Sequence, residues 1–249
     1  MKILDQTFKR FLQDLEAILG SGLRDVIIHG SCALGDFRPH KGDIDYIVMT
    51  ANNLDERVLT RLFAIHDSYR DNHELLLDQL EGTFYPEEYI STLDGNFIGA
   101  YIGTGRSGWR QTSKLENSLI DLRVASSRGI SLLGRPITIY NPSDNQIRLE
   151  LSSTLRNLND RLNGPSIEPF GNLMSIVHWS TRALCFLETG GIVSKGEGCR
   201  WARTKLDPQI YNDILFIAEN ERFPYNTEKL KDWMTKKCAS ILQMVAIHL

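Results

Sequence analysis

Two aspartates one residue apart, Asp43 and Asp45, stand at the start of an apolar run at residues 44–49. The run predicts a β-strand, and residues two apart on a strand point to the same face, so the two carboxylates would project side by side. Carboxylates are hard oxygen ligands, which Mg²⁺ prefers and often shares with substrate phosphates. An isolated Asp-x-Asp is usually a solvated strand end or a turn. The pair therefore predicts a metal site only together with a second feature.

A Gly-Ser turn supplies that second feature. Gly30 and Ser31 follow the β-branched run at residues 26–28, which predicts a buried strand that ends in a tight turn. Backbone N–H groups and a hydroxyl at such a turn can hold phosphate oxygens without a side chain in the way. A strand, a Gly-Ser turn and a second strand that opens with Asp-x-Asp is far less common than Asp-x-Asp alone. The combination predicts chemistry on a nucleoside triphosphate.

Glu81 is the candidate for a third acid in the site. Two Mg²⁺ ions would clamp the attacking and leaving oxygens of an in-line displacement, and a third carboxylate can take the proton from an acceptor hydroxyl. Residues 73–85 read as a strand, on which the alternation of side chains places Glu74 and Asp78 on the face opposite Glu81.

These residues need a scaffold, and the chain predicts an α/β (α+β) domain with a small mixed sheet at residues 1–142. Its expected elements are a helix at 3–19, strands at 26–28 and 44–49, a helix at 54–69, strands at 73–85 and 97–102, a helix at 114–127 and a short strand at 131–133. From residue 143 the apolar pattern is helical, with candidate helices at 143–162, 170–188, 196–205, 208–220 and 227–247. We expect residues 143–249 to form an all-helical bundle that contributes to the nucleotide and substrate cleft.

Composition narrows the class of protein. The 249 residues are 42% hydrophobic and 24% charged, which is the profile of a folded chain. Lys and Arg number 28 against 31 Asp and Glu, so the net charge near −3 gives no field that would recruit long nucleic acid or an anionic membrane. The four cysteines contain no C-x-x-C pair, which disfavours a zinc site and a disulfide framework. The sequence shows neither a targeting segment nor a membrane-length apolar run, so we expect a cytoplasmic protein. We expect it to be a monomer or a weak dimer.

The segment GSCALGDFRPHKGDID, residues 30–45, resembles the active-site signature of the polymerase-β-like nucleotidyltransferase superfamily. Within it, the chain is most similar to the aminoglycoside adenylyltransferases that modify streptomycin and spectinomycin and confer antibiotic resistance. Residues 118–136 are similar to the helix and strand that close the family's catalytic domain. Residues 182–202 resemble an Arg, Thr-Gly, Lys and Trp-Ala pattern of its helical domain. The resemblance implies that Arg182 and Lys195 contact the nucleotide phosphates and that Glu81 is the catalytic base.

The chain departs from the family pattern at two places. Gly42 stands where the family has a serine before Asp-x-Asp, so one hydroxyl near the metals is missing. Asn172 stands where the streptomycin and spectinomycin enzymes carry an acid, and a polycationic aminoglycoside is recognised largely by carboxylates. Glu168 could compensate. Trp109, in a Gly-rich loop, could stack on a sugar or base of the substrate, although packing beneath the loop explains it equally well.

The leading hypothesis is transfer of AMP from ATP with Mg²⁺ to a hydroxyl of a small, aminoglycoside-like molecule, with release of pyrophosphate. A second hypothesis keeps nucleotidyl transfer but makes the acceptor a protein or an RNA end. A third is a catalytically silent regulator that binds nucleotide. Manganese would satisfy the same oxygen ligands as magnesium.

Overall fold

The computed structural model describes residues 2–70, 73, 75–104, 108–163, 171–205, 207–209, 212, 236, 238–239 and 242–247. The chain divides into two compact units, Met1–Pro142 and Ser143–Leu249. None of the described helices is both long enough and apolar enough to cross a membrane.

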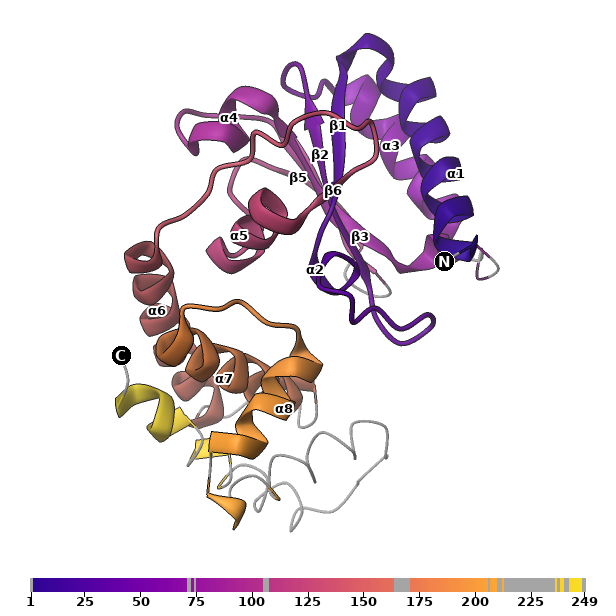
Figure 1. Cartoon of the computed structure of the whole chain (residues 1–249). Coiled ribbons are helices and arrows are strands. Elements are labelled where there is room, and N and C mark those ends of the chain that lie inside the picture. Colours follow the sequence, from indigo (N-terminus) through magenta and orange to yellow (C-terminus); the bar gives the residue numbers. More distant parts are fainter. Residues whose placement is uncertain are drawn as a thin grey trace. The chain divides into compact units, whose positions relative to one another are not determined.

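The first unit alternates helices and strands (Figure 1). In chain order its elements are α1 (Lys2–Leu19), a 3₁₀ turn (Gly20–Gly22), β1 (Leu23–Ile28), α2 (Gly30–Ala33), β2 (Ile44–Thr50), α3 (Glu56–Tyr69), a 3₁₀ turn (Leu77–Gln79), β3 (Leu80–Pro86), α4 (Glu87–Thr92), β4 (Gly99–Ile102), β5 (Trp109–Thr112), α5 (Leu119–Arg128) and β6 (Ile130–Ser131).

The strands described form one mixed sheet in the order β5-β4-β3-β2-β1-β6. Only the pairing of β2 with β3 is parallel among these strands, because α3 carries the chain back to the start of the next strand. The expectation of a mixed α/β fold is confirmed.

Helices cover both faces of this sheet (Figure 1). On one face, α1 and α3 bury an apolar stripe that includes Phe11 and Leu62 against Tyr46 and Val48 of β2. On the other face, α4 and α5 pack on residues such as Ile47, which alternates with Tyr46 along the strand. The middle of β2, from Ile47 to Met49, is therefore apolar on both faces, and Asp45 lies near the start of the strand.

Four predicted elements differ from the structure. The strand expected at residues 73–85 begins only at Leu80, because Leu76 adopts a left-handed backbone conformation (φ 54°) and a 3₁₀ turn follows it. Asp78 lies in that turn, so the argument from strand alternation does not apply to it, and Glu74 lies outside the described residues. The three consecutive leucines that suggested a strand instead fill the core beside β3.

The segment after β3 also differs from the sequence-based prediction. It contains two strands, β4 and β5, where one was expected, and Trp109 begins β5 rather than lying in a loop. The helix expected from residue 114 starts at Leu119, because Ser118 and Asp121 form a reciprocal capping box there. The short strand expected at 131–133 is found at Ile130–Ser131.

The described part of the second unit contains helices α6 (Asp144–Asn163), α7 (Gly171–Thr189) and α8 (Lys195–Lys205), close to three of the predicted ranges. Most residues of the candidate helices at 208–220 and 227–247 lie outside the described residues. That the whole of residues 143–249 is helical stays a prediction.

Candidate active site

The Gly-Ser turn directly follows β1 and touches β2. Gly30 has a positive φ of 57° and begins the four-residue helix α2. The backbone N–H of the preceding His29 donates to the carbonyl of Asp45 at 2.9 Å, which extends the pairing of the two strands. A Cβ on Gly30 would lie 1.9 Å from Asp45 Oδ2. Glycine is thus required here both by the backbone conformation and by the closeness of the acid.

Asp45 and Glu81 are direct partners in the parallel pairing of β2 with β3. Partnered residues project to the same face, so the two carboxylates come together at the end of the sheet where both strands begin. Asp43 precedes β2 by one residue and is exposed, whereas Asp45 and Glu81 are half-buried. The structure therefore brings the three acids chosen from the sequence to one place, beside the Gly-Ser turn.

Glu81 is held by donors from the next strand and the loop that follows it. The Tyr101 hydroxyl of β4 donates to Glu81 Oε1 at 2.7 Å. Thr104 donates to Glu81 Oε2 from its backbone N–H at 3.2 Å and from its hydroxyl at 2.9 Å. The same hydroxyl lies 3.0 Å from Asp43 Oδ1, so Thr104 connects two of the acids.

Tyr101 and Thr104 were not foreseen from the sequence. Their segment is rich in Gly and Thr and has no strong periodicity, so its pairing partner could not be read from the residues alone. The available signal was the strand expected at 97–102, which includes Tyr101. Only the observed register, with Tyr101 opposite Thr83, shows that its side chain shares a face with Glu81.

The acids suit magnesium in donor type. Within the described residues, no group of three or more His, Cys, Asp and Glu side chains is arranged to hold a metal ion. Mg²⁺, however, is commonly bound by one or two carboxylates together with waters and substrate phosphates, and Asp43 and Asp45 provide such a pair next to a turn suited to phosphate. The residues present therefore fit a metal that arrives with a nucleotide rather than a preformed protein cage.

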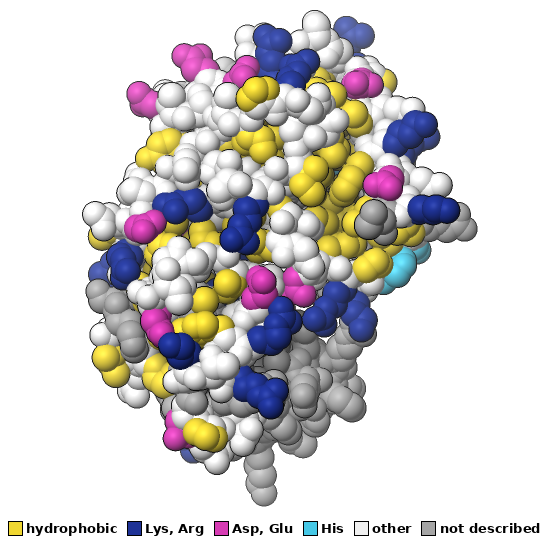
Figure 2. All heavy atoms as spheres, in the orientation of Figure 1, with side chains coloured by type: hydrophobic (Ala, Val, Ile, Leu, Met, Phe, Trp, Pro, Cys, Tyr) yellow, Lys and Arg dark blue, Asp and Glu magenta, His cyan; other side chains and the backbone are white. Residues whose placement is uncertain are grey.

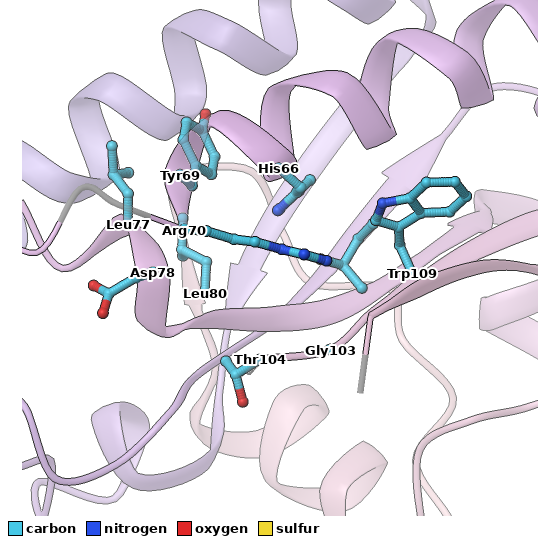
Figure 3. A pocket seen from close by; sticks show the side chains of 10 residues that line it. His66, Tyr69, Arg70, Leu77, Asp78, Leu80, Gly103, Thr104 and Trp109 are labelled. Atoms are coloured by element: carbon cyan, nitrogen blue, oxygen red, sulfur yellow. The ribbon is translucent and has the colours of Figure 1, made fainter. Parts of the chain in front are cut away.

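A small pocket adjoins these acids through Thr104 (Figure 3). Its volume is about 30 Å³, which is room for about two ordered waters. Its lining residues are His66, Tyr69, Arg70, Leu77, Asp78, Leu80, Ile102, Gly103, Thr104 and Trp109. Figure 3 shows Arg70 extended across the pocket toward Trp109.

Trp109 packs on α3 with one face of its ring. The indole stacks on Phe63, with ring centroids 4.0 Å apart and planes 9° apart, and its N–H donates to Asp67 at 3.3 Å. The side chain nevertheless remains 42% exposed. The packing interpretation of Trp109 therefore has support. Its strand partner is Ile102, so the indole lies on the α3 face of the sheet, opposite the Tyr101 and Glu81 side chains, and its contact with a substrate stays a prediction.

In the second unit, Arg182 on α7 and Lys195 on α8 share one neighbourhood. Gly198 of α8 allows the close packing, since a Cβ there would lie 3.1 Å from Arg182 Cγ. Burial, followed by the positive charges of Lys195 and Arg182, lowers the pKa of His178 to about 4. Within the described residues neither cation forms an ion pair with a carboxylate.

Lys195 also lies at a helix N-terminus. It is the first residue of α8, and the reciprocal bonds between Ser194 and Glu197, at 2.9 and 3.1 Å, cap that end. Of the remaining residues proposed from the sequence, Asn172 lies in the first turn of α7, and Glu168 lies outside the described residues.

Comparison with known proteins gives one informative result. No protein-family model and no curated protein matches the chain. Among solved structures, the chain is similar to spectinomycin adenyltransferase AAD(9) from Enterococcus faecialis, determined with ATP and spectinomycin; the TM-score is 0.66 over 97% of this chain and 98% of that chain, at 11% sequence identity. A likeness at this identity establishes the fold alone. The chain therefore has a nucleotidyltransferase fold.

Proposed function

We propose that this protein is a nucleotidyltransferase that moves AMP from ATP to a hydroxyl group of a small molecule and releases pyrophosphate. The observation that carries the proposal is the convergence of Asp43, Asp45 and Glu81 at one end of the sheet, beside the turn at Gly30. A solvated strand end would not require a glycine pressed against the acid, nor a second acid paired with it on the next strand.

The proposed roles follow from position. Gly30 and Ser31 would bind the triphosphate, and Asp43 and Asp45 would hold Mg²⁺, one or two ions, which when bound neutralises charge on the phosphates. The oxygen of the acceptor hydroxyl attacks the α-phosphorus of ATP, the bond from that phosphorus to the β-phosphate oxygen breaks, and pyrophosphate leaves. Glu81 takes the proton of the acceptor hydroxyl, which makes it the general base.

Arg182 and Lys195 are proposed to bind the phosphates from the second unit. Three observations support this role: the two cations are close enough to depress the pKa of His178, neither is paired with an acid among the described residues, and Lys195 begins a helix. A helix N-terminus with an adjacent cation favours an anion. Such groups would stabilise the charge that builds on pyrophosphate as it leaves.

For the acceptor, we propose an aminoglycoside-like molecule. The similar solved structure contains spectinomycin, and its fold is shared over almost the whole chain. On the face drawn in Figure 2, Lys and Arg side chains of the described residues are interspersed with Asp and Glu. A nucleic-acid end as acceptor would be favoured by clustered positive charge, so this face gives no reason to prefer it.

A pyrophosphate-release screen tests the proposal. Purified protein with Mg²⁺ and ATP is incubated with a panel of aminoglycosides, spectinomycin and hydroxyl-bearing metabolites, and labelled AMP on the acceptor is measured in parallel. We expect release that depends on one class of acceptor. Substitution Asp45→Asn should abolish transfer at an unchanged melting temperature. ATP binding without transfer to any member of the panel would instead support a silent nucleotide-binding protein.

A further inference from the structure

Glu81 makes its contacts with residues that neither the sequence nor the fold comparison assigns to a site. β4 runs antiparallel to β3, and Tyr101 lies directly opposite Thr83, two residues after Glu81 on the same face. The tyrosine hydroxyl reaches back along this face to Glu81 Oε1 at 2.7 Å. The orientation of the acid therefore depends on the neighbouring strand as well as on its own.

Tyr101 is itself fixed in place. The Arg110 guanidinium lies 4.1 Å from the centre of its ring, and Arg110 is paired with Glu116 at 2.7 Å. Burial, followed by the hydrogen bond to Glu81, raises the pKa of Tyr101 well above its usual value. Tyr101 is thus a donor to Glu81 throughout the neutral pH range.

The Glu81 carboxylate has more acceptor positions than its hydrogen-bond donors occupy. A carboxylate has about four acceptor positions, two on each oxygen. Thr104 can occupy both positions on Oε2, through its backbone N–H and its hydroxyl, whereas Tyr101 occupies one on Oε1. One position on Oε1 remains for the acceptor hydroxyl.

We propose that Tyr101 and Thr104 are positioning residues that orient Glu81 so that Oε1 receives the proton of the acceptor hydroxyl. This inference rests on the proposed function, in which Glu81 is the general base. Thr104 has a second task, because its hydroxyl lies between Glu81 and Asp43, at 2.9 and 3.0 Å. Its single proton can be donated to only one of the two carboxylates at a time, so it links the base to Asp43, one of the acids proposed to hold the metal, by alternating between them. It also supplies a hydroxyl in this region, where Gly42 provides none.

Kinetics of three variants test the inference. We expect Tyr101→Phe and Thr104→Val to lower kcat by about 10- to 100-fold, because misplacing a catalytic group by about 1 Å is enough for such a loss. KM for ATP should stay within about twofold in Tyr101→Phe, because among the acids the Tyr101 hydroxyl contacts only Glu81, which is not proposed to bind the nucleotide. Thr104→Ser keeps the hydroxyl and should recover most of the rate. Tyr89→Phe is the matched control: Tyr89 is a partly buried tyrosine of α4 that packs on Phe97, away from the acids.

Glu81→Gln separates failure of the inference from failure of the proposed function. If Glu81→Gln is inactive while Tyr101→Phe and Thr104→Val keep the wild-type kcat, the positioning roles are wrong and the base assignment stands. If the wild type transfers nucleotide to no acceptor, the proposed function fails. In that case, crystal structures of Tyr101→Phe and Thr104→Val still test the positioning roles. A Glu81 carboxylate that has turned from its wild-type orientation supports these roles, and an unmoved carboxylate overturns them.

Discussion

Asp45 and Glu81, which a whole helix separates in the sequence, are direct partners on adjacent parallel strands. The pairing follows from the β2-α3-β3 connection, because a helical crossover returns the chain so that the next strand begins at the same end of the sheet. Acids placed at the starts of both strands must then meet. On its other side, the Asp45 carboxylate lies against the backbone of Gly30. Glu81 and Gly30 together leave this carboxylate little freedom of orientation.

Replacing Gly30 by alanine should damage activity far more than stability. Gly30 and Gly35 both have positive φ, 57° and 74°, so alanine at either should cost about 1–2 kcal/mol of folding free energy. A Cβ at Gly30 would overlap Asp45 Oδ2, whereas one at Gly35 would meet nothing within 4 Å. We expect Gly30→Ala to displace the Asp45 carboxylate and reduce transfer by about 100-fold or more.

Gly35→Ala is therefore the matched control. It carries the same kind of backbone strain without the steric contact, and it should retain most of the wild-type rate. Urea unfolding and pyrophosphate release are measured for both variants. Equal rates in the two variants would show that the close approach of Gly30 to Asp45 is irrelevant to the chemistry.

The sequence was informative where a pattern has one physical explanation. Alternation and helical periodicity located α1, β1, β2 and α3, and the sharp turn at Gly30 followed from its residue type. The sequence was misleading at residues 75–77, where three leucines fill the core and lead into a 3₁₀ turn instead of forming a strand. The local pattern of such a short apolar run does not distinguish a buried strand from a buried turn.

The contacts of Glu81 could not be predicted from the sequence for a different reason. Tyr101 and Thr104 reach the acid through the register of β4 on β3, which is a long-range property. A shift of one residue would have turned Tyr101 to the opposite face. Asp43 and Asp45 could be proposed from one compact motif, whereas the groups that hold Glu81 are distributed over the fold.

Trp109 should contribute to acceptor binding through its exposed part. We expect Trp109→Ala to raise KM for the acceptor by about tenfold, the loss of about 1.4 kcal/mol of stacking and apolar contact, with KM for ATP unchanged. Phe63→Leu serves as the control, because it disturbs the stack beneath Trp109 but keeps the indole. The same rise in KM with Phe63→Leu would mean that the ring matters only for packing on α3.

The pKa of His178 should report on the cations of the second unit. Lys195→Met removes one of the two positive charges that lower this pKa, so the value should rise from about 4, although burial, the largest cause, remains. NMR titration of the histidine ring measures the change. Arg203→Gln, an exposed charge in the last turn of α8, should leave it where it is. An unchanged pKa in Lys195→Met would contradict the close placement of Lys195 and His178.

The same substitution tests the nucleotide role. Lys195→Met and Arg182→Gln should each raise KM for ATP by about tenfold or more, because a charge-assisted contact to phosphate contributes about 1.5–3 kcal/mol. Arg203→Gln should not. A variant that shifts the pKa of His178 but leaves KM for ATP unchanged would keep the geometry and remove Lys195 from the proposed site.

Stability should fall as the pH drops below about 6.5, and His66 should account for part of the loss. His66 is a buried residue of α3, its ring nitrogen lies 3.1 Å from the Tyr46 hydroxyl, and burial lowers its pKa to about 3. The unfolded chain then binds a proton more readily than the folded chain between pH 6.5 and 3, so the unfolding free energy decreases by up to about 1.4 kcal/mol for each pH unit that the pH falls in this window.

The variant His66→Gln, which can keep a hydrogen bond to Tyr46, tests this. Its unfolding free energy, measured by urea titration at pH 7, 6 and 5, should decrease less steeply than that of the wild type. Parallel slopes for the wild type and His66→Gln would show that this histidine is not the group whose protonation opposes folding.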